Sequence, residues 1–381
     1  MGPSVLTLIN INPNKLGALE EYALGLSSEL IRRGNFAAVG FSDYPPPWLA
    51  QRFNSAEIKV LKFNYERGKI RFIRDLRKAI KKYEINILHA TFYNIYSPVL
   101  IAATVGTSCR LIYSDQVSRI PGHRRKSILR SIFRFLKGRL CQKFIHAIIA
   151  DAKFIKRCQM QDNFARPDKI KIIYNGVNLE RFGDLGSSKR EDILPAFGIS
   201  PEPSVIVAIA QCIPWKGLNY LLEAAAIVVK ERPNTTFIII GDGPERVPLE
   251  KQADGLALKD NCIFTGNRVD TELFLGVADI FVLLSTWEEA FAFSLLEGMA
   301  SGCPVVATRI GAIPESVVEG LTGILVPPHD ALATADALLK LLKNDQLRLK
   351  MGREARKRVE THFSLDQWIN QTIDVYEKAL Y

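Results

Sequence analysis

Short apolar runs alternate with helix-forming segments along almost the whole chain, and this alternation restricts the fold more than any other feature of the sequence. The runs 5–11, 204–210 and 278–284 are rich in β-forming residues and too short for helices, which is typical of strands buried on both faces of a parallel sheet. Each run is followed by a polar turn and then by a helical segment. The pattern predicts an α/β chain built from repeated strand–helix units.

Length and charge both divide the chain into two halves. At 381 residues it is too long for one average domain and fits two of about 190 residues. Residues 1–190 carry 33 Lys and Arg against 14 Asp and Glu, whereas residues 191–381 carry 17 against 26. The basic first half is expected to meet an anionic surface such as phospholipid or lipid diphosphate. Its basic helices carry no known recognition motif, so we expect no nucleic-acid partner.

Cysteine usage and the first residues indicate a cytoplasmic protein. Six cysteines, at 109, 141, 158, 212, 262 and 303, are scattered without a CxxC pair or a metal-ligand spacing, which predicts reduced thiols. The N-terminus lacks the basic segment and long apolar core of a signal peptide. Residues 85–109, the longest stretch without Asp, Glu, Lys or Arg, are typical of a strand followed by a helix and not of a membrane span.

The stretch 285–303, STWEEAFAFSLLEGMASGC, is the strongest candidate for a reactive site. It begins where the apolar run 278–284 ends, and from about Phe293 it continues as a predicted helix until Gly302. A helix that starts at the carboxyl end of a parallel strand offers unpaired backbone N–H groups to an anion such as phosphate. Glu289 and Glu297 would then be placed to bind sugar hydroxyls and a diol, unless they are two solvated glutamates.

These glutamates belong to a longer pattern. They are followed by Gly-Met-Ala-Ser-Gly-Cys-Pro-Val-Val-Ala-Thr at 298–308 and by Gly-Ala-Ile-Pro-Glu at 311–315. The whole segment resembles the donor-site signature of the family 4 (group 1) retaining glycosyltransferases. The resemblance covers nearly the whole chain and is strongest from 174 to 328, where Tyr-Asn-Gly-Val-Asn-Leu-Glu-Arg-Phe at 174–182 is similar to the family's interdomain segment.

The resemblance implies the GT-B fold, an α/β architecture of two Rossmann-like βαβ domains facing each other across a cleft, with a C-terminal helix that crosses back to the first domain. We place the basic, acceptor-side domain at 1–176, completed by the crossover helix 363–381, and the donor-side domain at 177–362. The implied reaction transfers a sugar, with retention of anomeric configuration, from a nucleotide-diphosphate sugar to a hydroxyl of a glycan or lipid-linked acceptor. Such an activity belongs to cell-surface polysaccharide or glycolipid synthesis.

The resemblance also assigns residues to the donor. Glu289 is expected to position the donor sugar, and Lys216, at a helix start, is expected to neutralise the leaving diphosphate, so these two are the predicted catalytic residues. Glu297 is expected to hold the ribose hydroxyls. The other predicted donor-binding residues are Gln211, Phe291, Ala292, Phe293, Ser294, Gly17, Ala18, Gly241, Gly243 and Arg268. Since no Asp-x-Asp sequence is present to hold a divalent metal, we expect metal-independent catalysis and no cofactor.

Acceptor and membrane contacts are expected from the first half. His89 and Asp115 end predicted strands and are candidates for the acceptor side, although a structural, hydrogen-bonded role for His89 is equally open. Residues 68–83 predict a basic helix, and residues 119–143 predict an amphipathic basic one that either lies on anionic lipid at the inner face of the membrane or packs with a solvated basic face. The candidate membrane residues of the second helix are Arg124, Arg125, Arg130, Arg134 and Lys137.

Several positions depart from the family pattern and leave alternatives open. Ala18, Ala210, Gln211, Ala290 and Ala292 stand where the family more often has Gly or Arg. These departures allow a non-catalytic relative that binds a nucleotide sugar or a membrane. A nucleotide-sugar 2-epimerase of the same architecture is the second alternative, and it would need no acceptor.

Overall fold

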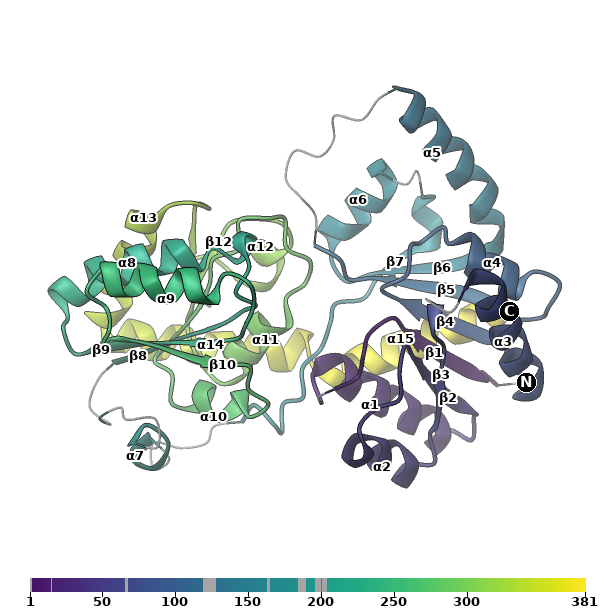
Figure 1. Ribbon diagram of the computed structural model, residues 1–381, viewed down its shortest axis with the longest axis horizontal. Coiled ribbons are helices and arrows are strands. Elements are labelled where there is room, and N and C mark those ends of the chain that lie inside the picture. Colours follow the sequence, from purple (N-terminus) through teal and green to yellow (C-terminus); the bar gives the residue numbers. More distant parts are fainter. Residues whose placement is uncertain are drawn as a thin grey trace. The chain divides into compact units, whose positions relative to one another are not determined.

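The structure, a computed structural model, describes residues 2–14, 16–65, 68–118, 128–162, 165–183, 190–195, 200 and 204–381, with the backbone alone for 128–134 and 162. The chain forms two compact units (Figure 1). The first unit comprises Met1–Val117, Gly122–Asn175 and Leu365–Tyr381, and the second comprises Ser118–Pro121 and Gly176–Ser364.

The described residues of the first unit form a seven-stranded parallel sheet in the order β3-β2-β1-β4-β5-β6-β7. The strands are β1 (Val5–Ile9), β2 (Ala37–Phe41), β3 (Lys59–Lys62), β4 (Ile87–Thr91), β5 (Arg110–Asp115), β6 (Ile145–Ala150) and β7 (Ile170–Ile172). The helices are α1 (Ala18–Arg32), α2 (Pro47–Ser55), α3 (Lys69–Lys82), α4 (Pro98–Thr104), α5 (Ile128–Cys141) and α6 (Lys153–Asp162), joined by α15 (Leu365–Leu380). Every residue of β1, β2 and β4 is buried because helices cover both faces of the sheet.

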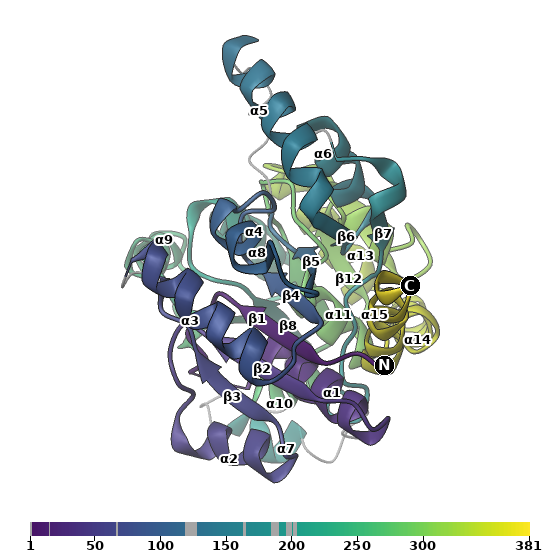
Figure 2. The ribbon, with the colours of Figure 1, turned by 90° about the vertical axis from the view of Figure 1, so that its right-hand side faces the viewer.

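The C-terminal helix α15 packs against α1 in the first unit (Figure 1 and Figure 2). The rings of Tyr22 and Trp368 stack with centroids 3.6 Å apart and planes 9° from parallel. The Tyr22 hydroxyl donates a hydrogen bond of 3.0 Å to the Thr372 hydroxyl, and burial raises the pKa of Tyr22 well above its usual range. Aromatic stacking and a satisfied buried hydroxyl therefore fasten the last helix to the first unit.

The described residues of the second unit form a six-stranded parallel sheet in the order β10-β9-β8-β11-β12-β13. The strands are β8 (Ser204–Ile209), β9 (Thr235–Ile240), β10 (Cys262–Gly266), β11 (Ile280–Leu283), β12 (Val305–Thr308) and β13 (Gly323–Val326). The helices are α7 (Arg190–Ile193), α8 (Leu218–Glu231), α9 (Arg246–Gly255), α10 (Thr271–Gly276), α11 (Phe293–Ala300), α12 (Ile313–Ser316), α13 (Ala331–Leu342) and α14 (Asp345–His362). Figure 1 shows α8, α9 and α13 on one face of this sheet and α10, α11 and α14 on the other.

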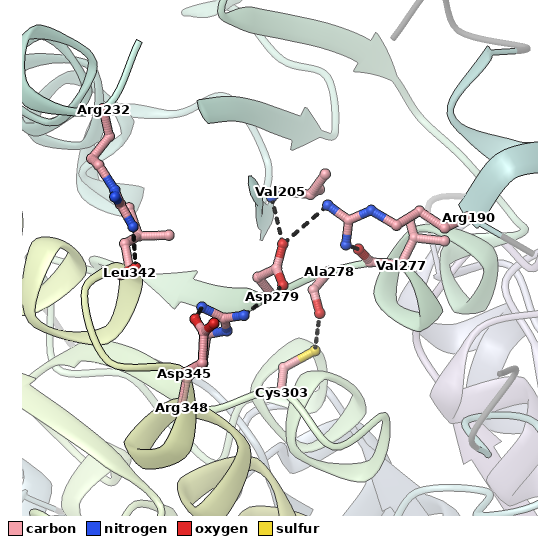
Figure 3. A network of polar contacts seen from close by, with 10 residues as sticks. All are labelled: Arg190, Val205, Arg232, Val277, Ala278, Asp279, Cys303, Leu342, Asp345 and Arg348. Atoms are coloured by element: carbon pink, nitrogen blue, oxygen red, sulfur yellow. Dashed lines mark hydrogen bonds and ion pairs between the residues drawn. The ribbon is translucent and has the colours of Figure 1, made fainter. Parts of the chain in front are cut away.

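Asp279, just before β11, joins several elements at the amino ends of the strands, as Figure 3 shows. One carboxylate oxygen accepts hydrogen bonds from the backbone N–H of Val205 at 2.8 Å and from the guanidinium of Arg190 at 3.1 Å. The other lies 3.4 Å from the guanidinium of Arg348. A carboxylate with three cationic or N–H partners is well satisfied, and it fixes α7 and α14 to the edge of the sheet opposite the carboxyl ends.

All six cysteines are free thiols, as the sequence predicts, and Cys141 is the one among them that is not buried. Burial raises the pKa of Cys262 and Cys303 to about 12. These two thiols therefore stay protonated and unreactive at neutral pH.

The predicted fold class is confirmed: two α/β units of Rossmann type, with a C-terminal helix that returns to the first. The chain passes from the first unit to the second between Asn175 and Gly176, one residue before the boundary predicted from the sequence. It returns to the first unit at Leu365, whereas the predicted crossover helix begins at 363. Helix α2 was not predicted, because the run of prolines at 45–47 is typical of a loop. Pro47 occupies the first helical position, where a missing N–H costs nothing.

Candidate active site

Most of the predicted donor residues lie at the carboxyl ends of four neighbouring strands of the second unit. Arg268 follows β10, Gly241 and Gly243 follow β9, Lys216 follows β8, and Glu289 follows β11. Because β10, β9, β8 and β11 are consecutive in the sheet and all parallel, these segments form one continuous edge. Ligands of open α/β sheets bind outside this edge.

Lys216 and Glu289, which follow the adjacent strands β8 and β11, form an ion pair on that edge. The Lys216 ammonium donates hydrogen bonds of 2.8 Å and 3.0 Å to the two carboxylate oxygens of Glu289. The side chains are 18% and 8% exposed, so the pair is largely shielded from water while still reachable from outside. Charge-assisted bonds in such surroundings are among the stronger polar contacts in proteins. The structure thus brings together the two predicted catalytic residues, which are 73 positions apart in the sequence.

Two glycines allow the loops around the ion pair to pack closely. Gly217 has φ +67°, and a Cβ placed there would lie 2.0 Å from the carbonyl oxygen of Leu284. Gly311 has φ +57°, and a Cβ there would lie 2.3 Å from the carbonyl oxygen of Glu289. The neighbouring residue Ala312 donates its N–H to that same Glu289 carbonyl at 2.9 Å. Both positions require glycine, so the backbone around Lys216 and Glu289 is fixed from each side.

The turn after β9 packs against the loop after β8. Gly241 and Gly243 have φ +142° and +156°, and a Cβ at either would lie within 2.4 Å of a carbonyl oxygen of Ala210 or Cys212. The N–H of Cys212 donates to the Asp242 carbonyl at 3.0 Å. The polar turn is therefore held directly beside the segment that carries Gln211, an exposed residue.

Arg268 and Phe291 are less directly available than predicted. The guanidinium of Arg268 binds the carboxylate of Asp270 with an Nε–Oδ1 distance of 2.8 Å, and this pairing raises the pKa of Arg268 and lowers that of Asp270. The Phe291 side chain is 2% exposed, and its ring meets Phe363 edge to face at 5.0 Å. The Phe291 side chain thus belongs to the core, which leaves its backbone as the part that could contact a ligand.

The start of α11 lies next to the ion pair along the chain. Ala292 is its N-cap, in extended conformation and without a side-chain cap, and Phe293 is its first residue. Phe293, Ser294 and Glu297 are each half-buried. The first N–H groups of an eight-residue helix and a carboxylate one turn further on therefore stand at the strand end predicted for an anionic ligand.

Gly17 and Ala18 begin α1 in the first unit. The Glu20 carboxylate, on a residue that is 5% exposed, accepts a hydrogen bond of 3.1 Å from the Gly17 N–H. Gly17 is in extended conformation as the N-cap, and Ala18 is half-buried. This geometry is a helix cap, and the donor contact predicted for Gly17 and Ala18 remains a prediction.

His89 and Asp115, the two candidates for the acceptor side, are both buried. His89 is 0% exposed, and its ring nitrogens lie 2.6 Å from the hydroxyls of Tyr376 and Ser114. Burial lowers the pKa of His89 to about 3, so the ring is neutral at physiological pH. Asp115 is 8% exposed and accepts a hydrogen bond from the Gln159 amide. For His89 this geometry favours the structural role over contact with an acceptor.

The predicted membrane residues are described in part. Arg124 and Arg125 lie outside the described residues, and for Arg130 and Arg134 the structure describes the backbone of α5 alone. Lys137 is half-buried on the same helix. Among the helices that the structure describes, none has both the length and the apolar character needed to cross a membrane. The described residues also contain no cluster of three or more His, Cys, Asp or Glu arranged to hold a metal ion.

Sequence reasoning missed several residues that shape this edge. Trp215 and Trp287 stack with ring centroids 4.2 Å apart, and the Trp215 carbonyl accepts a hydrogen bond of 2.8 Å from the Thr286 N–H. These contacts join the loop after β8 to the loop after β11. A signal was present, because two of only four tryptophans in the chain lie within two positions of Lys216 and Glu289.

Two family models match the chain. Residues 19–181 match the model described as "Glycosyltransferase Family 4", and residues 189–358 match the one described as "Glycosyl transferases group 1". Curated relatives include N-acetyl-alpha-D-glucosaminyl L-malate synthase of Bacillus anthracis, 30% identical over 56% of this chain and 55% of the relative. D-inositol 3-phosphate glycosyltransferase of Corynebacterium glutamicum is 32% identical over 57% and 53%. The match spans about half the length of each of these relatives.

Solved structures match over nearly the full chain. A glycosyltransferase from Rickettsia africae superposes with a TM-score of 0.85 at 22% identity, covering 100% of this chain and 99% of the other. HepE of Anabaena, solved in complex with UDP, superposes with a TM-score of 0.81 at 20% identity, covering 98% and 100%. At these identities the likeness establishes the fold.

Proposed function

Because the chain belongs to the family 4 (group 1) glycosyltransferases, we propose that it transfers a sugar from a nucleotide-diphosphate sugar to a hydroxyl of a glycan or lipid-linked acceptor. The observation that carries this proposal is the continuous edge of four strand ends in the second unit, with the Lys216–Glu289 pair where β8 and β11 end. The loop after β10, the polar turn after β9, Lys216 after β8 and the start of α11 together suit a nucleotide, its diphosphate and a sugar. HepE, which shares the fold, was solved with UDP-glucose.

In this proposal Lys216 has two partners in succession. Without donor, its ammonium and the Glu289 carboxylate neutralise each other. An ammonium has three N–H donors, so a diphosphate can take one while Glu289 keeps another or turns to the hydroxyls of the donor sugar. Lys216 and the first N–H groups of α11 then stabilise the charge that grows on the diphosphate as it leaves.

The reaction we propose keeps the anomeric configuration. The bond between the anomeric carbon and the diphosphate oxygen breaks, and a bond to the acceptor oxygen forms on the same face of the sugar. The acceptor's hydroxyl proton passes to the departing diphosphate. Positive charge from Lys216 and the helix N-terminus serves the role that a divalent metal has in other transferases, so we propose metal-independent transfer.

We also propose a peripheral membrane location at the anionic inner face, with the acceptor held there. On α5, Phe135, Leu136 and Leu140 are 40%, 54% and 66% exposed, the exposed Arg139 lies among them, and the exposed Lys143 follows just after the helix. Apolar side chains that enter the headgroup region, with cations beside them, are typical of interfacial helices. Each base near an anionic surface contributes roughly 1 kcal/mol of binding.

Flotation with liposomes tests the membrane proposal. The chain should float with vesicles that contain phosphatidylglycerol and remain behind with phosphatidylcholine alone. Replacing Leu136 and Leu140 with serine should abolish flotation, whereas the same change at Leu332, 69% exposed on α13, should not. Equal flotation of both variants would contradict the role of α5.

Product analysis tests the catalytic proposal and separates it from its alternatives. Incubation with nucleotide sugars and a lipid-linked acceptor fraction should release a nucleoside diphosphate and yield a product with the donor's anomeric configuration by NMR. A 2-epimerase would convert the donor without acceptor, and a non-catalytic relative would bind it unchanged.

Glu289→Ala should slow transfer, and Glu297→Ala should weaken donor binding. Parental turnover by both variants would show that the site is wrongly assigned.

A further inference from the structure

The two loops that carry Lys216 and Glu289 also line a hollow that contains neither of these residues. This hollow of about 470 Å³ lies between them and the start of α8. Four rings line it, those of Trp215, Trp287, Tyr220 and His329, and neither Lys216 nor Glu289 belongs to its lining. Its volume is within the ordinary range for small-molecule sites. The site described above makes no use of this hollow.

The tryptophan pair supplies the apolar wall of the hollow. The planes of Trp215 and Trp287 are 10° from parallel, and both side chains are half-buried, so the stacked rings still present apolar surface outward. The hydrogen bond from the Thr286 N–H to the Trp215 carbonyl fixes their backbones together. A rigid aromatic wall of this kind loses little entropy when a ligand covers it.

The opposite rim of the hollow is polar and locally strained. His329 has φ +63°, which is uncommon for a residue other than glycine, and its Nδ1 lies 2.9 Å from the Tyr220 hydroxyl. The two rings meet edge to face at 5.1 Å. Backbone strain of this sort tends to occur where a side chain is needed for function. Asn219 and Glu245 add an amide and a carboxylate to the lining.

The charge of the hollow selects among ligands that could lie on aromatic rings. Of the described residues that line it, none is Lys or Arg, and Glu245 contributes a negative charge. A nucleotide or a lipid phosphate would therefore meet no cation there and would be repelled by Glu245. A neutral sugar suits the same surface, because one face of a pyranose is lined by C–H groups while its hydroxyls pair with amides, carboxylates and imidazoles at the rim.

We propose that this hollow is a carbohydrate-binding subsite that holds one or two residues of a neutral glycan, separate from the donor position. The glycan would be a growing acceptor or product chain, and this identity alone rests on the proposed transferase function. Trp215 directly precedes Lys216 in the chain, and Trp287 lies two positions before Glu289. A glycan bound to the two tryptophans would therefore be held by the same two loops that carry the ion pair.

Fluorine NMR on protein labelled with 5-fluorotryptophan tests the proposal directly. The chain has four tryptophans, and Trp48 and Trp368 lie outside the hollow, on α2 and α15. Maltotriose, cellotriose, mannotriose and chitotriose are titrated to 20 mM with no donor present. At least one should shift the Trp215 and Trp287 signals, with Kd about 1 mM as expected for a small polar ligand, and leave Trp48 and Trp368 unchanged.

Two variants separate binding from folding. His329→Gly suits the φ of +63° and removes the imidazole, so it should retain the melting temperature and weaken binding at least threefold. Tyr220→Ala should weaken it likewise, and Trp48→Ala, on the exposed surface of the first unit, should have no effect.

The proposal is overturned if none of the four saccharides moves the Trp215 and Trp287 signals, or if all four tryptophan signals move together. It is also overturned if UMP moves the Trp215 and Trp287 signals more strongly than the sugars do, because the hollow would then be a nucleotide site. The titration contains no donor and needs no turnover, so its failure leaves the proposed transferase function standing.

Discussion

Removing Lys216, the cation of the Lys216–Glu289 pair, should destabilise the second unit more than removing both charges together. Lys216→Met keeps the length of the side chain but leaves the Glu289 carboxylate, on a residue 6% exposed, without its cation. A buried charge that has lost its partner lowers the free energy of unfolding by about 3–5 kcal/mol. Because the Lys216 side chain is 18% exposed, water can reach the Glu289 carboxylate in Lys216→Met, and we expect a loss of about 3 kcal/mol. Glu289→Gln should cost less, since the remaining ammonium is nearer to solvent.

A double-mutant cycle isolates the interaction. Lys216→Met combined with Glu289→Gln should be more stable than Lys216→Met alone, with a coupling energy of about 2 kcal/mol. In a unit of this size, a change of 1 kcal/mol shifts the melting temperature by roughly 2–4 °C, so calorimetry resolves the effect.

The exposed pair of Arg309 and Glu319 provides the matched control. Its side chains are 54% and 46% exposed, and the same cycle there should give less than about 1 kcal/mol. If the Lys216 and Glu289 changes are additive within 0.5 kcal/mol, the threshold usual for residues without contact, the reasoning from burial is wrong.

Three further outcomes follow from the geometry. Gly217→Ala should lower the melting temperature of the second unit and reduce donor binding, because its Cβ would lie 2.0 Å from the Leu284 carbonyl oxygen. The control Gly255→Ala, whose Cβ would have no atom within 4 Å, should change neither property. Tyr22→Phe should destabilise the first unit by about 1 kcal/mol in urea unfolding, through loss of the hydrogen bond to Thr372. Burial lowers the pKa of His89 to about 3, so the unfolded chain takes up the proton first and stability falls as pH drops from 6.5 toward 3; His89→Gln should flatten that pH dependence.

The periodicity of the sequence was enough to predict the strand–helix repeat because buried parallel strands are nearly continuous apolar runs. The run 278–284 contains β11, and the helix predicted from Phe293 is α11. Helices such as α9 and α10 were not predicted. They are short, and α9 contains Pro248 and ends with Gly255, so local propensity gave a weak signal there.

Contacts between distant segments were beyond sequence reasoning. The pairing of Lys216 with Glu289 depends on β8 and β11 being neighbours, and strand order is not written in local patterns. His89 shows the same limit: the sequence placed it at the end of a strand, which suggested a ligand contact. That position was wrong, because β4 runs from Ile87 to Thr91 with His89 in its middle, and the hydroxyl of Tyr376, 287 positions away, lies within hydrogen-bond distance of its ring. The hollow of Trp215 and Trp287 likewise forms from loops that the fold brings together.

Binding calorimetry with UDP, GDP and ADP tests most directly the claim that the edge around Lys216 holds a nucleoside diphosphate. The parent should bind at least one of the three, and Lys216→Met should weaken that binding at least tenfold while Lys230→Met, at the far end of α8, leaves it unchanged. Binding of equal strength in the parent and in Lys216→Met would contradict the account.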